Sequence, residues 1–220
     1  AAPVDAIVGL VGRIAPVLPD GSVVTDVGSV KSGIAREGHA AIAGCARSGG
    51  RAHFVGSHPM AGSERTGWEN GSAALFEGRT CFVTPTPDTD AAAAARIAAF
   101  WGALGMTVAS VSPEAHDEIV AHISHLPQVL ASALCAFLAG QDPVWRDYAG
   151  NGLRDTTRIA AGDPVLWRAI LEANRERVLK ALAGFRGELD AIEEAMVRSD
   201  WPSLANRMAR GKAYREAFKR

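Results

Sequence analysis

The first half of the sequence alternates strand-like and helix-like segments, and this alternation constrains the fold more than any other feature. The runs SVVTDVG, HFVGSHP, TCFVTPT and MTVASVS are rich in β-branched or apolar residues and have the length of strands. Helical patterns separate them: an alanine-rich stretch at about residues 31–45, and DTDAAAAARIAAFWGALG, with Asp88 or Asp90 as its cap. A polar loop from Met60 to Gly78 joins the second and third strands. The pattern predicts a mostly parallel, doubly wound sheet with crossover helices.

The sequence opens in a helical pattern, whereas a doubly wound sheet normally opens with a strand and a glycine-rich turn. Apolar residues recur at helical spacing from Val4 to Leu18, and Pro19-Asp20-Gly21 ends the pattern. We therefore expect the first strands of the sheet, and the turn that binds pyrophosphate, to be missing from these 220 residues. Asp5 and Arg13 interrupt the apolar pattern and no basic segment precedes it, which predicts neither a signal peptide nor a membrane-spanning helix.

Strand signals cease at Pro113, and the rest of the sequence is helical in pattern. One helix is expected from about Pro113 to Gly140, and Asp163-Pro164 supplies an N-cap and a first-turn proline for a second long helix. We expect a partial dinucleotide-binding domain over residues 1–112 and a helical domain over residues 113–220. The closing segment WPSLANRMARGKAYREAFKR is expected to be a basic helix with a solvated face.

The second long helix carries an apolar seam that needs a helical partner. Its members step by four, three, four, three and four residues, as in a coiled coil: Val178, Leu182, Phe185, Leu189, Ile192 and Met196. The partner is either another helix of the same bundle or a second copy of the chain, because both bury an identical stripe.

Charge and cysteine content limit the kinds of partner. The chain is 48% hydrophobic and 21% charged, and its 23 basic and 24 acidic side chains give a net charge of −1. No basic field is available for nucleic acid or an anionic membrane, so partners are expected to be small molecules or protein. Cys45, Cys81 and Cys135 show neither a CxxC pair nor metal-ligand spacing, which fits reduced thiols in a cytoplasmic protein.

Two segments follow strands at the edge of the sheet where ligands bind in such folds. In Asp26-Val27-Gly28-Ser29-Val30-Lys31 a glycine lets the backbone approach a ligand, although alone the segment also reads as a tight turn. His58 ends another strand before a rigid proline and a glycine loop, and histidine moves protons near neutral pH. A single histidine there is often structural, but Ser29 falls on the same rim and could orient it.

Three histidines of the first long helix invite a metal site, which we do not expect. On an α-helix His116 and His125 differ by nine residues and point to opposite sides, so only His122 and His125 share a face. No third ligand is in view. The segment Ser124-His125-Leu126-Pro127-Gln128 is instead expected to place a polar patch beside a pocket.

A basic segment precedes the second long helix. Arg154 and Arg158 lie four residues apart on one helical face, with Asp155 beside them. The planar guanidinium is the favoured partner of a substrate carboxylate. A surface network of the three charges is the alternative.

Five segments, taken together and in order, resemble the prephenate dehydrogenase family over nearly all 220 residues. They are DVGSVK, VGSHPMAGSERTG, LFEGRTCFVTPT, SPEAHDEIVAHISHLPQVLA and LRDTTRIAAGDPVLWRAILEAN. The resemblance implies a Rossmann-like domain, a helical dimerisation domain, an active site in the cleft between them, and a homodimer. It further implies NAD-dependent oxidative decarboxylation of prephenate to 4-hydroxyphenylpyruvate, a step of tyrosine biosynthesis.

The resemblance also assigns roles to residues. His58 matches the catalytic histidine, Ser29 the serine close to it and to the nicotinamide, and Arg158 the arginine that holds a substrate carboxylate. The remaining matches are substrate-pocket positions (Glu64, His125, Gln128, Trp167), a loop that the partner subunit contributes (Gly152), and cofactor positions shared with Ser29 (Pro3, Val27, Gly28).

Two departures from the family pattern leave alternatives open. Some members carry a second histidine where this sequence has Gln128, so the choice between prephenate and arogenate is open. The residues that separate NAD from NADP are absent from the sequence, so NAD is expected and NADP stays possible. Without the glycine-rich turn, a non-catalytic binding or dimerisation module is a further alternative.

Overall fold

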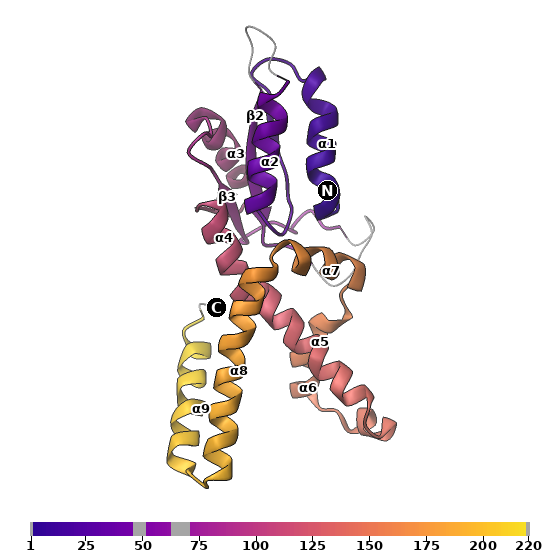
Figure 1. Cartoon of the computed structure of the whole chain (residues 1–220), viewed down its shortest axis with the longest axis vertical. Coiled ribbons are helices and arrows are strands. Elements are labelled where there is room, and N and C mark those ends of the chain that lie inside the picture. Colours follow the sequence, from indigo (N-terminus) through magenta and orange to yellow (C-terminus); the bar gives the residue numbers. More distant parts are fainter. Residues whose placement is uncertain (1, 46–51, 63–70, 219–220) are drawn as a thin grey trace. The chain divides into compact units, whose positions relative to one another are not determined.

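The computed structural model describes residues 2–45, 52–62 and 71–218. They form two compact units, Ala1–Val178 and Leu179–Arg220. The first unit contains the sheet and most of the helices (Figure 1). The division predicted at residues 112 and 113 lies inside this unit and stays a prediction.

The four predicted strands form one sheet in the order β1-β2-β3-β4. They are β1 (Val23–Thr25), β2 (His53–Pro59), β3 (Thr80–Thr84) and β4 (Thr107–Ser110). β1 pairs with β2 and β3 with β4 in parallel, whereas β2 and β3 are antiparallel. The reversed pair follows from its connection, because a parallel pair needs a crossover and the described residues 71–79 of this connection form turns.

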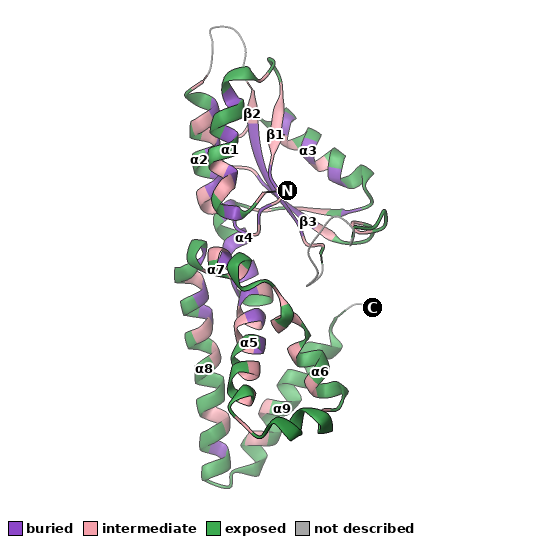
Figure 2. Ribbon diagram, turned by 90° about the vertical axis from the view of Figure 1, so that its right-hand side faces the viewer, coloured by how far each residue is buried: buried purple, intermediate pink, exposed green. Residues whose placement is uncertain are grey.

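Helices cover both faces of the sheet, as Figure 2 shows. α1 (Ile7–Ile14), flanked by the 3₁₀ turns η1 (Val4–Ala6) and η2 (Ala15–Val17), lies with α2 (Ser32–Ala43) on one face, and α3 (Ala91–Ala103) lies on the other. Each face has its own apolar core: one contains Ile7, Val11, Ile34, Ile42 and Phe54, and the other Val55, Val83, Ala93, Ile97 and Trp101. The predicted doubly wound, Rossmann-like architecture is confirmed, and Asp90 is the residue that caps α3.

The first long helical run contains a π-helical segment in its middle. α4 (Pro113–Val120) begins after the N-cap Ser112, η4 (Ala121–His125) is π-helical, and α5 (Leu126–Ala139) completes the run. The run is long and apolar enough to cross a membrane by length and composition alone. The core helices of globular proteins can have the same length and composition. Because α4 carries buried polar residues, this helical run has the character of a core helix.

The second long helix is in fact two helices, so the predicted single helix is wrong. After η5 (Pro143–Tyr148), α6 (Asn151–Thr157) and η6 (Arg158–Ala161), the predicted cap Asp163 begins α7 (Pro164–Ala173), and α8 (Arg175–Val197) follows. Asn174 separates them with φ −115° and ψ 25°. Its buried amide donates to the carbonyl oxygen of Asp117 at 2.8 Å, which holds the break in place.

The second unit consists of the greater part of α8 and α9 (Trp201–Glu216). Ser199 takes a positive φ of 55° in the turn, Asp200 caps α9, and Arg207 donates to Glu188 across the pair at 2.8 Å. Leu189 and Met196 of the predicted seam are 49% and 53% exposed. These two residues therefore leave part of the predicted seam exposed as apolar surface.

Candidate active site

A cavity of about 430 Å³ opens at the carboxyl ends of β1 and β2. Ser29 and His58 line it from the strand ends, and Gln128, Arg158 and Trp167 line it from helical segments. The other lining residues are Pro59, Met60, Ala61, Gly62, Ser124, Ile159, Gly162, Asp163, Leu166 and Ile170. Its volume falls in the range of small-molecule sites, roughly 300–1,000 Å³.

His58 is the buried titratable group of this cavity, with 9% of its surface exposed. Burial, and then the neighbouring His116, Lys31 and His125, lower its pKa well below that of an ordinary histidine. The ring is therefore neutral at neutral pH, which is the form that accepts a proton.

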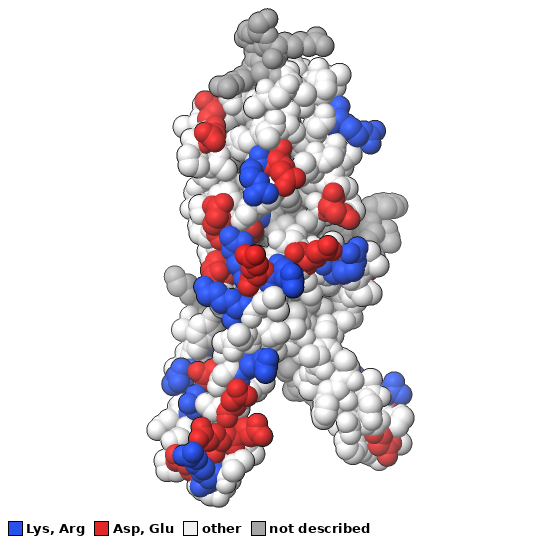
Figure 3. Space-filling model, viewed as in Figure 1, with Lys and Arg blue, Asp and Glu red and all other residues white. Residues whose placement is uncertain are grey.

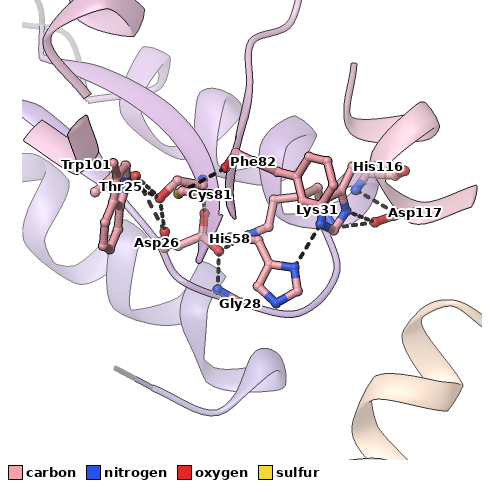
Figure 4. A network of polar contacts seen from close by, with 12 residues as sticks. Thr25, Asp26, Gly28, Lys31, His58, Cys81, Phe82, Trp101, His116 and Asp117 are labelled. Carbon is pink, nitrogen blue, oxygen red and sulfur yellow. Dashed lines mark hydrogen bonds and ion pairs between the residues drawn. The ribbon is translucent and has the colours of Figure 1, made fainter. Parts of the chain in front are cut away.

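A chain of hydrogen bonds leads from His58 into the protein (Figure 4). His58 Nδ1 lies 2.9 Å from His116 Nε2, and His116 Nδ1 lies 2.9 Å from Asp117 Oδ1. Asp117 also accepts from the backbone N–H groups of Lys31 at 2.7 Å and Ser32 at 2.9 Å. Burial alone would raise the pKa of Asp117, but the hydrogen bonds from His116, Ser32 and Lys31 hold it below its usual value. Asp117 is thus ionised, and it caps α2 from a different helix.

A buried ion pair lies beside this chain at the end of β1. The Lys31 side chain is fully buried and pairs with Asp26. Asp26 also accepts from the backbone N–H groups of Gly28 at 2.9 Å and Ser57 at 3.3 Å. Burial lowers the pKa of Lys31, and the attraction of Asp26 opposes this. A Cβ at Gly28 would lie 2.8 Å from Ile7 Cδ1 and 2.9 Å from Asp26 Oδ2, so a larger residue in this turn would have to displace these side chains.

The prediction that His116 and His125 point to opposite sides assumes a regular α-helix, and the run between them is π-helical in part. Both are buried, and His125 Nδ1 lies 3.2 Å from the Asn174 amide that also binds Asp117. The extra residue per turn in the π-helical η4 rotates His125 away from its α-helical position. His122, expected to share the face of His125, is exposed and bonds the carbonyl oxygen of Glu118.

Comparison with known proteins decides the family. Residues 1–110 match the nucleotide-binding domain of prephenate dehydrogenase, and residues 112–210 match its dimerization domain. The chain belongs to the prephenate dehydrogenase family. This assignment agrees with the resemblance carried by the five ordered segments.

Curated relatives of this family are similar over most of the chain. A cyclohexadienyl dehydrogenase of Zymomonas mobilis is 32% identical over 99% of this chain and 73% of its own length. The prephenate dehydrogenases of Bacillus subtilis and Lactococcus lactis are each 30% identical, over 89% and 99% of this chain. The matched region spans 52% and 59% of the length of these last two relatives.

Solved structures of the prephenate dehydrogenase family share the fold. Aquifex aeolicus prephenate dehydrogenase, in complex with hydroxyphenyl propionate and NAD⁺, superposes with a TM-score of 0.88 at 34% identity, covering 98% of this chain and 73% of that one. Synechocystis arogenate dehydrogenase superposes with a TM-score of 0.82 at 30% identity, covering 98% and 76%. The nucleotide-binding domain match and the NAD⁺ complex support NAD as the cofactor.

The residues present fit the nicotinamide end of NAD. Ser29 and His58 present a hydroxyl and an imidazole to one cavity at the carboxyl edge of the sheet, where doubly wound folds bind dinucleotides. Gly28 keeps the strand-to-helix turn tight beside them. A G-x-G-x-x-G turn for the pyrophosphate does not occur in the 220 residues.

The structure brings together some of the residues predicted for the site of this family and leaves others apart. Ser29, His58, Gln128, Arg158 and Trp167 share the cavity. His125 lies behind Trp167, with ring centroids 6.1 Å apart and no place in the cavity wall. Pro3, Val27, Gly28 and Gly152 are also outside the wall, and Glu64 lies outside the described residues.

Sequence reasoning missed the buried groups behind the cavity. Asp26 and Lys31 stand in the DVGSVK segment and Asp117 follows His116, but nothing in their spacing indicates burial. A lysine five residues after an aspartate at a strand end is the pattern that could have suggested the ion pair.

The buried histidines make stability sensitive to acid. Burial lowers the pKa of His125 to about 4, with Asp117 opposing this effect and His116 reinforcing it. The unfolded ring protonates first, below pH 6.5, so the free energy of unfolding should fall by roughly 3 kcal/mol as pH drops from 6.5 to about 4. Urea unfolding at a series of pH values measures this loss. A His125→Gln variant should weaken the dependence of the free energy of unfolding on pH. An unchanged dependence would show that His125 is not its source.

Proposed function

We propose that the protein catalyses the NAD-dependent oxidative decarboxylation of prephenate to 4-hydroxyphenylpyruvate, a reaction of tyrosine biosynthesis. The observation that carries the proposal is one cavity that joins a neutral, buried His58 to Arg158, with Ser29 between the strand ends. A base and a carboxylate anchor on opposite elements are what this substrate, with a ring hydroxyl and two carboxylates, requires.

His58 is the catalytic base in this proposal. It takes the proton of the ring hydroxyl as the carbon–hydrogen bond at the same carbon breaks. Bound NAD would supply the acceptor for the hydride. The ring carboxylate leaves as carbon dioxide, and the electron pair of the broken carbon–carbon bond moves through the ring to the new carbonyl oxygen, which takes the proton back from His58 and becomes the phenol hydroxyl. Aromatisation of the ring drives the reaction. Ser29 orients the hydroxyl and the imidazole, because its own hydroxyl donates and accepts hydrogen bonds.

Arg158 binds a substrate carboxylate that does not leave. Charge-assisted hydrogen bonds are worth roughly 1.5–3 kcal/mol, so Arg158→Met should raise KM for prephenate about 10–100-fold with a smaller change in kcat. Arg158→Lys should recover part of the loss, since lysine keeps the charge without the planar fork. Steady-state kinetics measure both constants.

Arg154 provides the matched control for this substitution. It lies four residues away on α6, donates to the carbonyl oxygen of Ala149 at 3.3 Å, and does not line the cavity. Arg154→Met should leave KM within about twofold of the starting value. Equal effects at the two arginines would show that the carboxylate is bound elsewhere.

The other predicted site residues complete the proposal. Trp167 and Gln128 shape the pocket wall and His125 supports Trp167 from behind. Glu64 is proposed to bind the substrate, and Gly152 is proposed to be contributed by a partner subunit. Pro3, Val27 and Gly28 lie along the cofactor. The functional division is a partial dinucleotide-binding domain at residues 1–112 and a helical substrate and dimerisation domain at residues 113–220.

The protein is a cytoplasmic homodimer in this proposal, without nucleic-acid or membrane partners. The match to a dimerization domain and the exposed Leu189 and Met196 support the dimer. Positive and negative side chains are interspersed on the face in Figure 3, which supports small-molecule chemistry over nucleic-acid binding.

Arogenate is the second candidate substrate, favoured by one observation. Gln128, at the position where some members carry histidine, lines the cavity, and its amide bonds Ser132 at 3.3 Å. An amide there accepts a hydrogen bond from an ammonium group as readily as it donates to a keto oxygen. NADP is the corresponding second cofactor.

Kinetics with each substrate, prephenate or arogenate, and each cofactor, NAD or NADP, test the function. We expect the highest kcat/KM with prephenate and NAD. A higher value with arogenate would assign the second substrate. No turnover with any pair, together with no NAD binding by calorimetry, would contradict the catalytic proposal and leave a binding or dimerisation module.

A further inference from the structure

The hydrogen bonds behind His58 determine which of its ring nitrogens carries the proton. Asp117 is ionised and accepts from two backbone N–H groups, so the contact of 2.9 Å with His116 Nδ1 requires that this nitrogen donates. With His116 as the neutral imidazole, which has one N–H, its Nε2 carries no proton and accepts.

The same reasoning extends to His58. Because His116 Nε2 accepts, His58 Nδ1 must donate across their separation of 2.9 Å. The neutral His58 ring therefore carries its proton on Nδ1 and a lone pair on Nε2. In Figure 4 the second ring nitrogen of His58 points away from the network, and His58 lines the cavity.

We propose that His116 and Asp117 are positioning residues that hold His58 in the tautomer whose Nε2 accepts the substrate proton. The proposal rests on the function proposed above and deepens it. When Nε2 takes the proton, His58 becomes an imidazolium whose Nδ1–H is already bonded to His116, and His116 is in turn bonded to the Asp117 carboxylate. The positive charge formed at His58 is thus stabilised by hydrogen bonds that are already in place, and neither ring has to reorient.

The surrounding groups make this chain rigid. The Nδ1–H of His116 meets a carboxylate whose Oδ1 is also held by the Lys31 backbone N–H, and Phe82 packs edge-on to the His116 ring at 5.2 Å between centroids. The charged and titratable groups facing the two histidines are Lys31 with its partner Asp26, His125, and Arg177, which lies 3.9 Å from Asp117. The two rings themselves are buried, so water does not compete for their inner nitrogens.

Nitrogen NMR of the resting protein tests the tautomer without substrate or cofactor. We expect the His58 ring to show an unprotonated Nε2 and a protonated Nδ1 at pH 7, and the His116 ring the same arrangement. A protonated Nε2 on His58 would overturn the proposal. Because no turnover is involved, this result is independent of whether prephenate is the substrate.

Two substitutions of His116 test the consequence for catalysis. His116→Leu removes the acceptor for His58 Nδ1–H and should lower kcat by about 10²-fold, part of the worth of a positioned base, with KM within about twofold. His116→Gln keeps an acceptor oxygen near the position of Nε2 and should retain most of the activity and the His58 tautomer. A simple loss of packing would instead lower the activity of both variants and would not separate kcat from KM.

His122→Gln is the control, since His122 is exposed on the same helical run and bonds only a backbone carbonyl among the contacts described. It should leave kcat unchanged. If His116→Leu retains full kcat while His58→Asn loses it, His58 is the base but His116 does not position it. If neither substitution changes turnover, the proposed function itself fails, and the NMR result still decides the tautomer.

Discussion

Replacing His58 with Asn is expected to lower kcat for prephenate oxidation by roughly 10²–10⁴-fold, the usual worth of a positioned general base. Asparagine is smaller than histidine and keeps a polar group at the end of β2, but it cannot take up a proton at neutral pH. Prephenate binding, measured by calorimetry, should remain within a few-fold because Arg158 supplies the main ionic contact in the proposed site. The kinetic measurement is kcat at saturating prephenate and NAD.

A second histidine offers a control for this substitution. His39 is partly buried in α2, and its Nε2 lies 3.0 Å from Thr89 Oγ1, outside the cavity. His39→Asn should retain the starting kcat. Undiminished turnover in His58→Asn, or an equal loss in both variants, would remove His58 from the role of base.

Replacing Asp26 with Asn is expected to destabilise the fold by about 3–5 kcal/mol, because it leaves the fully buried Lys31 ammonium without its carboxylate. Urea unfolding at pH 7 measures the loss. The loss should shrink at higher pH, where Lys31 sheds its proton and a neutral amine is easier to bury. The burial that already lowers the pKa of Lys31 acts in this direction.

Two further variants separate the charge from the change of shape at Asp26. Adding Lys31→Met to Asp26→Asn removes the unpaired charge and should recover most of the lost stability. Glu172→Gln breaks an exposed ion pair with Arg168 at 3.0 Å and should cost less than about 1 kcal/mol. A loss below about 1 kcal/mol for Asp26→Asn alone would mean that the buried pair contributes little.

The sequence predicts the framework of the fold because local periodicity and caps determine it. The strand at His53–Pro59, the cap at Asp90 and the start of α7 at Asp163 are as expected. The reversed pairing of β2 with β3 and the break at Asn174 were not, since both depend on connections and on tertiary contacts that have no local pattern.

The residues that line the cavity could be predicted from the sequence, whereas the buried groups behind them could not. His58, Ser29 and Arg158 stand at strand or helix ends, where ligand sites are expected, and they do line one cavity. The partnership of His116 with His58 joins residues 58 positions apart. The position of His125 depends on a π-helical segment, whose different number of residues per turn cannot be read from the spacing of apolar residues.

The contacts of Asp117 bear on the order in which activity and folded structure are lost on heating. The carboxylate that accepts a hydrogen bond from His116 also accepts from the backbone N–H groups of Lys31 and Ser32 at the start of α2. Packing of α4 against α2 and positioning of the proposed base His58 are therefore coupled. A partial opening that frees α4 would disconnect His58 while both apolar cores are still intact. Heat inactivation should therefore run ahead of global melting, and added ligand that engages His58 should delay both together.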